Sequence, residues 1–265
     1  MLVVNSLSGD VKQRRLLGNI SFTLAKGESL CIVGESGSGK TTLLKALLGL
    51  MPISQGYLDL NYTVGHYQRG VNQTSIGLPG VGWVMQNPLA ALNPLQSVGA
   101  SVIEGIYKDR LSKAQQQTLL EEVFTQVQLP IILAQRTPGQ LSIGQAQRVC
   151  IARALISRPK LIFFDESLSA LDAVVQKQIG RVIDDIKRSQ GLGYLFVTHD
   201  LGFARAYGDK ILLLKAGKVS AYQSVDEFFN APACDYAGEL IAAANRLGAL
   251  EESEHKFNHL KELTA

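Results

Sequence analysis

Short, almost wholly apolar runs alternate along the chain with longer stretches in which apolar residues recur at helical spacing. Residues 29–33 (SLCIV), 161–164 (LIFF) and 194–197 (YLFV) are typical of strands buried on both faces. The stretch that begins at Lys40 and residues 174–189 repeat apolar positions every three or four residues, which predicts amphipathic helices. Strands that alternate with helices in this way favour an α/β sheet.

Weaker signals predict the remaining strands. Residues 2–4 and 20–24 predict short strands, consistent with an edge sheet, and residues 56–86 are glycine-rich and favour β structure. Residues 211–214 and 219–222 flank the turn KAGK, so we predict a hairpin there.

A helix-rich stretch from about residue 87 to 160 interrupts the alternation of strands and helices. Within it, residues 98–129 are predicted to be largely helical, with a stop at Pro130. After Ser224 the chain is predicted to turn helical again, and then to become charged and frayed at its end. We therefore expect a helical subdomain inserted into the α/β core.

Composition narrows the class of protein. Apolar residues make up 46% of the 265 residues, and the net charge of +3 gives no case for nucleic-acid binding. Cys31, Cys150 and Cys234 stand far apart, so a disulfide framework or a zinc site is not expected, and a reducing compartment fits. Neither a secretory signal nor an apolar run of ~18 residues is evident. We expect a chain that is soluble by itself and that can still dock onto a membrane partner.

The segment GESGSGKT joins the first buried strand to the helix that follows. It fits the pattern G-x-x-x-x-G-K-T through Gly34, Gly39, Lys40 and Thr41. Glycines let backbone N–H groups approach phosphate oxygens, and the helix adds the positive end of its dipole. Lys40 is expected to reach the β- and γ-phosphates, and the Thr41 hydroxyl to hold Mg²⁺. The segment therefore predicts a site for a nucleoside triphosphate.

Two acidic residues follow the apolar run at residues 161–164. Asp165 ends the predicted strand, where a carboxylate beside a phosphate loop can help to hold Mg²⁺. Glu166 comes directly after it and can polarise the attacking water. The chain contains no N-K-x-D, the guanine-reading element of many GTPases, which favours ATP over GTP.

The stretch LSIGQAQR supplies a second anion site. Ser142 and Gln145 have the spacing of a capping box that opens a helix over residues 143–157. Ser142, Gly144 and the start of this helix can cradle an anion. Two cradles in one chain make sense if each ATP lies between two chains, held by the Lys40 loop of one and the Ser142 helix of the other.

Taken together, these motifs resemble the nucleotide-binding subunit of an ABC transporter over roughly residues 1–245. The D-loop is SALD (169–172), the switch histidine is His199 in VTHD, and Gln86 in WVMQNP matches the Q-loop. The resemblance implies a P-loop NTPase with a RecA-like core, an antiparallel β subdomain and an inserted α-helical subdomain. The implied boundaries are a core at 1–86 and 160–223, a helical subdomain at about 87–159 and a C-terminal helical extension at 224–265.

The resemblance also implies roles for individual residues. Glu166 orients the attacking water, His199 contacts the γ-phosphate, and Gln86 links the γ-phosphate and Mg²⁺ to the transmembrane partner. Asp172 carries communication across the dimer interface. The residues expected to hold Mg²⁺ are Thr41, Gln86 and Asp165. Those expected to bind ATP are Gly34, Glu35, Ser36, Gly37, Ser38, Gly39, Lys40, Thr41, Thr42, Ser142, Gly144 and Gln145.

The chain departs from the family pattern in three places. Family members often stack an aromatic residue on adenine between the first two strands, whereas the first aromatic here is Phe22, inside the second strand. Arg14 or Arg15 offers a guanidinium plane instead. Ile143 replaces the first signature glycine, and Ser167 replaces the common proline after DE. One altered signature suggests a heterodimer with unequal ATP sites, with a homodimer as the alternative.

Two further segments, MQNPLAALNPLQSVG and residues 231–244, resemble importers of the oligopeptide, dipeptide and nickel group. Peptides, nickel and metal–chelator complexes all remain open as cargo. His255 and His259 stand four residues apart, as some metal ligands do, but their charged neighbours and the lack of a third ligand favour a solvated tail.

The resemblance implies a set of partners as well: a second ABC ATPase subunit, two transmembrane permease subunits and an extracytoplasmic solute-binding protein. It implies a peripheral location on the cytoplasmic face of the cell membrane. Two other classes stay open at this point. A soluble ABC-type ATPase of translation or DNA repair would normally have two cassettes or long coiled coils, and neither is evident. A small-molecule kinase would keep Lys40 and Asp165 but has no use for LSIGQ and His199.

Overall fold

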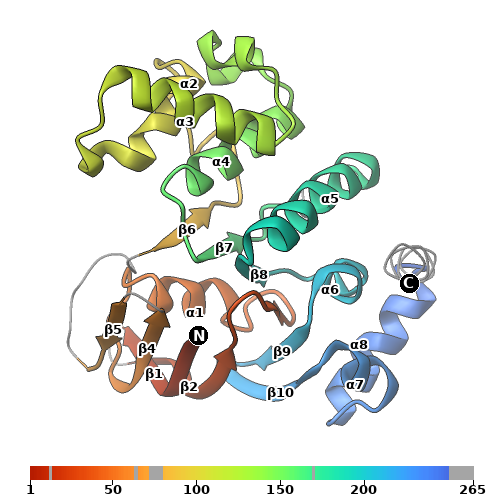
Figure 1. Ribbon diagram of the computed structural model, residues 1–265. Helices are drawn as coiled ribbons and strands as arrows, with labels where there is room; N and C mark the ends of the chain where they lie inside the picture. The colour runs from red at the N-terminus through yellow and green to blue at the C-terminus, as the bar shows by residue number, and fades with distance from the viewer. Residues whose placement is uncertain (12–13, 63–64, 72–79, 169–170, 251–265) are drawn as a thin grey trace. The chain divides into compact units, whose positions relative to one another are not determined.

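The computed structural model describes residues 1–11, 14–62, 65–71, 80–168 and 171–250 (Figure 1). The chain divides into two compact units. The first unit joins Met1–Pro79 to Tyr194–Ala265, and the second unit is Gly80–Gly193. Among the helices in the described ranges, none combines the length and the apolarity that a membrane crossing requires.

The first unit is built on two groups of strands. The antiparallel sheet has the order β2-β1-β4-β5 and consists of β1 (Leu2–Val11), β2 (Arg14–Leu24), β4 (Gln55–Tyr62) and β5 (Gly65–Arg69). The other group has the order β10-β9-β3-β8 and consists of β3 (Ser29–Val33), β8 (Gly193–Val197), β9 (Lys210–Lys215) and β10 (Lys218–Ser224). Strand β3 is parallel to both β8 and β9, whereas β10 is antiparallel to β9.

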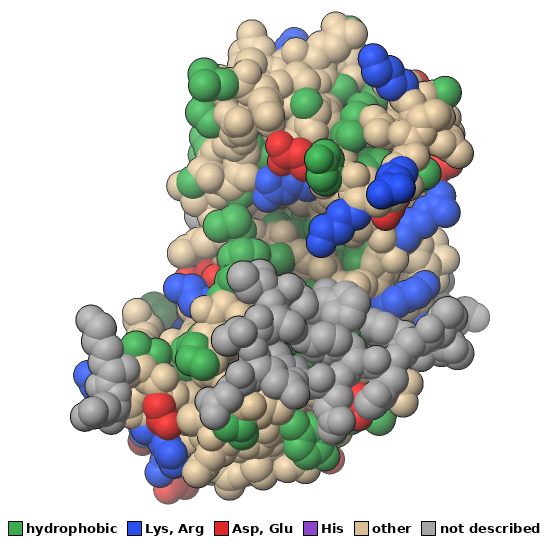
Figure 2. Space-filling view, turned by 90° about the vertical axis from the view of Figure 1, so that its left-hand side faces the viewer, with side chains coloured by type: hydrophobic (Ala, Val, Ile, Leu, Met, Phe, Trp, Pro, Cys, Tyr) green, Lys and Arg blue, Asp and Glu red, His purple; other side chains and the backbone are tan. Residues whose placement is uncertain are grey.

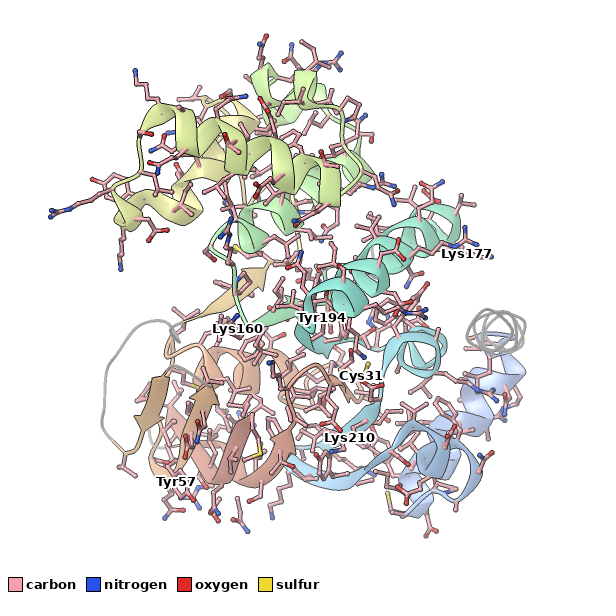
Figure 3. All side chains as sticks on the ribbon, viewed as in Figure 1. Cys31, Tyr57, Lys160, Lys177, Tyr194 and Lys210 are labelled. Carbon is pink, nitrogen blue, oxygen red and sulfur yellow. The ribbon has the colours of Figure 1, made fainter. Side chains whose placement is uncertain are left out.

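The buried strands and the hairpin confirm the sequence predictions. Every residue of β3 and β8 is buried, including Cys31 and Tyr194, which are labelled in Figure 3. The turn between β9 and β10 places Ala216 and Gly217 at φ 48° and 74°, the left-handed conformation that a two-residue hairpin loop requires. Strands β3 and β8 were predictable because burial on both faces leaves an unbroken apolar run.

The predictions of short strands at residues 2–4 and 20–24 were wrong in length, since β1 and β2 are much longer. Ser6 has φ 49°, and the pairing of β1 with β2 shifts register after Val4 and again after Leu7. Such bulges break the alternation of inward and outward side chains, so the apolar pattern stops before the strand does.

Four helices complete the described part of the first unit: α1 (Lys40–Leu47), α6 (Leu201–Tyr207), α7 (Val225–Asn230) and α8 (Asp235–Arg246). Helix α1 buries Leu43, Leu44 and Leu47 and packs against β2, while α8 packs against α6 and β10. The helical prediction after Ser224 is confirmed, because the Ser224 side chain caps α7 with a capping box. The predicted frayed end, residues 251–265, lies outside the described residues.

The second unit combines a pair of parallel strands with a set of helices. The strands are β6 (Val81–Val84) and β7 (Leu161–Asp165). The α-helices are α2 (Val98–Ile103), α3 (Lys113–Gln126), α4 (Ile143–Leu155) and α5 (Ala173–Gln190), with short 3-10 turns at Glu104–Asp109, Ile131–Gln135 and Pro138–Gln140. Helices α2, α3 and α4 pack on one another, and α4 also contacts β6 (Figure 1).

The structure subdivides the predicted helical stretch at 98–129. The backbone at Arg110 turns left-handed, with φ 49°, and a new helix starts after Ser112. Helix α4 also ends earlier than the predicted residue 157, because Arg158 adopts φ 50° and its N–H closes onto the Leu155 carbonyl at 2.8 Å. Both breaks are made by single left-handed residues other than glycine, which no helix stop signal announces.

Replacement of Ser112 by Ala is expected to lower the free energy of unfolding by about 1 kcal/mol, because the Ser112 side chain accepts from the Gln115 N–H at the start of α3. Urea unfolding followed by circular dichroism measures the change. Ser112→Asp keeps an acceptor at the cap and is the matched control, so it should stay near the wild type. Equal losses in both variants would contradict the capping role.

Candidate functional site

The predicted phosphate loop connects β3 to α1 in the first unit. Gly34, Gly37 and Gly39 have φ angles of 148°, 79° and 106°, which side chains other than glycine rarely adopt. A Cβ atom on Gly34 would lie 2.3 Å from the Leu214 carbonyl oxygen, whereas no described atom lies within 4 Å of a Cβ on Gly37. The loop is therefore packed against β9 at its start and open along its crest, where a ligand can approach the backbone.

Lys40 folds back over this loop. Its side chain is only 4% exposed, and its Nζ donates to the carbonyl oxygens of Gly34 at 2.8 Å and of Glu35 at 3.0 Å. The buried Ser38 hydroxyl has no hydrogen-bond partner among the described residues, and no side chain caps the start of α1 at Gly39. A cation, a hydroxyl and uncapped N–H groups are the donors that phosphate oxygens accept from. Glu35 and Ser36 are exposed, and Thr41 and Thr42 are half-buried in the first turn of α1.

His199 leaves the strands at the same edge as the phosphate loop. Strands β3 and β8 are parallel, and the Thr198 N–H donates to the Ile32 carbonyl at 3.1 Å, so the segments that follow the two strands start side by side. The His199 side chain is exposed. Asp200 caps α6 through a bond from the Phe203 N–H at 2.9 Å, which fixes the backbone on the far side of the histidine.

The second unit brings Gln86 and Glu166 together. Strands β6 and β7 are parallel, with Val84 opposite Phe164, so both side chains follow the same edge of the strand pair. The Gln86 amide Nε2 donates to Glu166 Oε2 in a long hydrogen bond of 3.5 Å. Glu166 adopts φ 46°, a strained conformation for a residue other than glycine, and such strain is concentrated at functional sites. Asp165, directly before it, is buried.

Ser142 opens α4 with the predicted capping box. The Ser142 hydroxyl accepts from the Gln145 N–H at 3.2 Å, and the Gln145 side chain accepts from the Ser142 N–H at 3.0 Å. A Cβ on Gly144 would lie 2.8 Å from a methyl of Val175, so a glycine at this position lets α5 approach α4. Ile143, the departure from the family signature, is 54% exposed.

The structure describes only some of the remaining predicted residues. Ser169 of the D-loop lies outside the described residues, as do His255 and His259. Asp172 is described and caps α5, because its Oδ1 accepts from the Val174 N–H at 3.1 Å and the Val175 N–H at 2.9 Å. The residues predicted to bind ATP and Mg²⁺ or to act in hydrolysis thus fall into two groups. The phosphate loop and His199 belong to the first unit, whereas Gln86, Ser142, Gly144, Gln145, Asp165 and Glu166 belong to the second.

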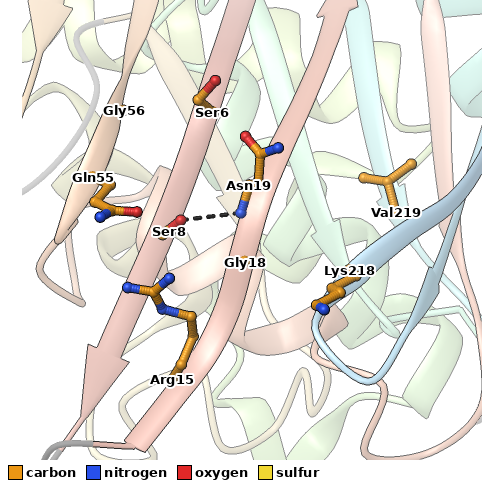
Figure 4. Close-up of a pocket in the computed structure, with 9 residues that line it drawn as sticks. All are labelled: Ser6, Ser8, Arg15, Gly18, Asn19, Gln55, Gly56, Lys218 and Val219. Atoms are coloured by element: carbon orange, nitrogen blue, oxygen red, sulfur yellow. Dashed lines mark hydrogen bonds between the residues drawn. The ribbon is translucent and has the colours of Figure 1, made fainter.

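Arg15, one of the two arginines suggested for the adenine, lines a cavity of about 550 Å³ between β1, β2, β4 and β10 (Figure 4). Its Nε donates to Asp10 Oδ1 at 3.1 Å, so the two side chains form an ion pair. Arg14 is exposed at the start of β2. The hairpin turn beside this cavity reaches the phosphate loop, since the Gly217 N–H donates to the Ser38 carbonyl at 2.8 Å.

The sequence analysis missed Tyr236. The Glu35 N–H of the phosphate loop donates to its phenol oxygen at 3.4 Å, and the Lys215 ammonium lies 4.1 Å from the centre of its ring. The only signal in the sequence was that residues 231–244, which include Tyr236, resemble a segment of importer subunits. No spacing rule connects Tyr236 to a loop 201 residues away.

Comparisons with known proteins agree with this geometry. The sequence profile of the family described as ABC transporter matches residues 17–169. The oligopeptide transport ATP-binding protein OppF of Haemophilus influenzae is 34% identical over 228 residues, which cover 85% of this chain and 68% of that protein. The protein of the same name from Streptococcus pyogenes serotype M1 is 33% identical over 227 residues, which cover 85% of this chain and 74% of that protein.

Two solved structures have the same fold. One is the ATP-binding cassette MJ0796, a dimer in a post-hydrolysis state bound to ADP and Pi, with a TM-score of 0.71, 27% identity and coverage of 85% of this chain and 99% of that one. The other is cbiO1 from Clostridium perfringens, with a TM-score of 0.76, 24% identity and coverage of 95% and 98%. They confirm the predicted fold class, a P-loop NTPase. Because the family profile covers more than half of the chain and the curated relatives are a third identical over most of it, the chain belongs to the ABC transporter family as an ATP-binding subunit.

Proposed function

We propose that this chain hydrolyses ATP to power an ABC importer of peptides. The observation that carries the proposal is the contact of Gln86 with Glu166 at the ends of adjacent parallel strands, in a chain whose glycine loop wraps around Lys40. The choice of peptides as cargo rests on relatives that are named as oligopeptide transport ATP-binding proteins.

ATP is proposed to bind with its phosphates in the loop from Gly34 to Thr42. The loop offers the Lys40 ammonium, the buried Ser38 hydroxyl and the uncapped N–H groups at the start of α1, which together suit a polyphosphate. Glycine at positions 34 and 37 keeps the crest of the loop clear of side chains. Lys40 then exchanges its backbone carbonyl partners for phosphate oxygens, which replaces neutral acceptors with charged ones.

Mg²⁺ is proposed to accompany the ATP, held by Thr41, Gln86 and Asp165. Magnesium usually binds through one or two carboxylates together with substrate phosphates, so the donor set fits. A separate cluster of three His, Cys, Asp or Glu is absent from the residues that the structure describes. When bound, the ion neutralises charge that develops on the phosphates. Glu166 orients the attacking water, while Lys40 and His199 stabilise the transferring phosphoryl group.

A second ATPase subunit is proposed to complete each site. The start of α4 presents N–H groups and the Ser142 hydroxyl, but in a unit separate from the phosphate loop. The exposed Ile143 offers apolar surface beside them that a partner can bury. The negative charge of the γ-phosphate is fully stabilised only when the phosphate loop of one subunit and the Ser142 helix of the other both contact it. ATP therefore favours the closed pair of subunits, and hydrolysis lets the pair separate. The altered signature at Ile143 supports a heterodimer, with a homodimer as the alternative.

The second unit is proposed to dock onto two transmembrane permease subunits, which places the chain peripherally at the membrane. Hydrophobic side chains reach its surface between charged ones in the upper part of Figure 2. Leu95 and Tyr107 are 91% and 86% exposed, and exposed apolar groups of this size mark interaction surfaces when they gather. The other large hydrophobic side chains exposed between Gln86 and Ser142 are Leu89, Ile131 and Ile132.

Copurification with the permease subunits, followed by ATPase assays in liposomes with the solute-binding protein, tests the proposal. We expect a complex with two permease subunits whose ATP hydrolysis is stimulated several-fold by short peptides. The parallel samples contain nickel chloride or a nickel–chelator complex. If one of these nickel samples stimulated ATP hydrolysis and peptides did not, nickel or the nickel–chelator complex would be the cargo instead of peptides. ATP hydrolysis without any copurifying membrane subunit would instead favour a soluble ABC-type ATPase.

A further inference from the structure

The Gly34–Glu35 peptide of the phosphate loop is held from both sides. Its carbonyl oxygen, on Gly34, accepts from Lys40 Nζ at 2.8 Å. Its N–H, on Glu35, donates to the Tyr236 phenol oxygen at 3.4 Å. The carbonyl and the N–H of a trans peptide point in opposite directions, so the two contacts fix the plane of one rigid group. Tyr236 thereby restrains the orientation of the first peptide group of the loop.

Tyr236 is itself firmly positioned. It lies in the first turn of α8 and is 8% exposed, and the Lys215 ammonium at the end of β9 stands 4.1 Å from its ring centre. Burial raises the pKa of the phenol, the Glu35 backbone N–H lowers it, and the Glu35 carboxylate raises it again, with a net increase. The phenol therefore keeps its proton at neutral pH and acts as a neutral partner of the loop.

The same C-terminal segment also touches the helix that follows His199. A Cβ on Gly202 in α6 would lie 2.4 Å from the Ala249 carbonyl oxygen, so the chain just beyond α8 packs directly onto the α6 backbone. Leu250 is buried at the end of this segment. Residues 235–250 thus contact both the phosphate loop and the helix that follows His199.

We infer that Tyr236 is a positioning residue for nucleotide binding, through which the C-terminal segment 235–250 holds the phosphate loop in its binding conformation. The inference rests on the proposed function, since it concerns the same ATP site. A loop that is fixed before the nucleotide arrives binds more tightly, because less conformational entropy is lost on binding. The contact is made to the backbone of the loop and not to the reacting atoms. It therefore acts on the bound ground state and the transition state alike.

Tyr236→Phe in the full-length chain tests this. The variant keeps the ring and its contact with Lys215 but loses the phenol oxygen. We expect the dissociation constants of MgATP and MgADP, measured with a fluorescent nucleotide competitor, to rise in parallel by roughly three- to tenfold. The turnover number should stay within about twofold of the wild type, as expected when uniform binding is lost. Amide hydrogen exchange of the loop around Glu35 should accelerate in the nucleotide-free protein.

Tyr222→Phe is the matched control, because the Tyr222 phenol bonds to the Thr23 backbone carbonyl and not to the loop. It should leave nucleotide affinity and loop exchange unchanged. The inference is overturned if Tyr236→Phe binds nucleotide like the wild type, or if both variants weaken binding equally. A wild-type chain that fails to bind MgATP would count against the proposed function instead, so the two failures are distinguishable.

Discussion

Replacement of Glu166 by Gln is expected to reduce ATP turnover by about 10²–10⁴-fold while MgATP binding is retained. The amide preserves the size of the side chain and can still contact Gln86, whose Nε2 lies 3.5 Å from Glu166 Oε2. It cannot accept a proton from the attacking water at neutral pH. ATP therefore persists in the site, and the closed pair of ATPase subunits should accumulate. Turnover is measured by phosphate release, and pairing by size-exclusion chromatography in MgATP.

Glu122→Gln is the matched control for this variant. Glu122 lies on α3 of the same unit, where its carboxylate forms an exposed ion pair with Arg158 at 3.6 Å. The same change of charge at Glu122 should leave turnover near the wild-type value, because an exposed ion pair contributes little to stability. Neither Glu122 nor Arg158 belongs to the proposed nucleotide site. Unchanged turnover in Glu166→Gln would remove Glu166 from its assigned role.

The parts of the site that could be predicted are those with a local signature. Gly34, Gly37 and Gly39 stand close together because the backbone needs φ angles that other residues avoid, and that requirement is visible in the sequence. The capping box of Ser142 and Gln145 is likewise complete within four residues. Such features depend on neighbours in the chain, so they can be recognised without knowledge of the fold.

The parts that could not be predicted depend on contacts between distant segments. Gln86 and Glu166 are 80 residues apart, and their contact follows from the parallel register of β6 and β7. The full length of β1 was hidden by its bulges after Val4 and Leu7, where pairing with β2 changes register. Tyr236 reaches the phosphate loop only because α8 packs beside β10 and α6. Tertiary packing, which no local pattern encodes, decides each of these cases.

Replacement of Lys40 by Ala is expected to weaken MgATP binding by roughly 10- to 100-fold, the effect of losing hydrogen bonds between a cation and charged oxygens. Turnover should fall further, because the ammonium also stabilises charge on the transferring phosphoryl group. Isothermal titration calorimetry measures the affinity, and phosphate release under saturating ATP measures the turnover. The nucleotide-free protein should also lose stability by about 1–3 kcal/mol, since the buried Gly34 carbonyl loses the Nζ donor that lies 2.8 Å away.

Lys45→Ala is the matched control for Lys40→Ala. It distinguishes the loss of a phosphate ligand from the loss of one positive charge on the same helix. Lys45 lies in the last turn of α1 with its side chain exposed, so its removal changes the net charge equally without touching the loop. It should bind MgATP like the wild type and lose little stability. If Lys40→Ala lowered stability but left the MgATP affinity unchanged, Lys40 would be a structural cation that ties Gly34 and Glu35 together. The phosphates would then have to be held by backbone N–H groups and the Ser38 hydroxyl alone.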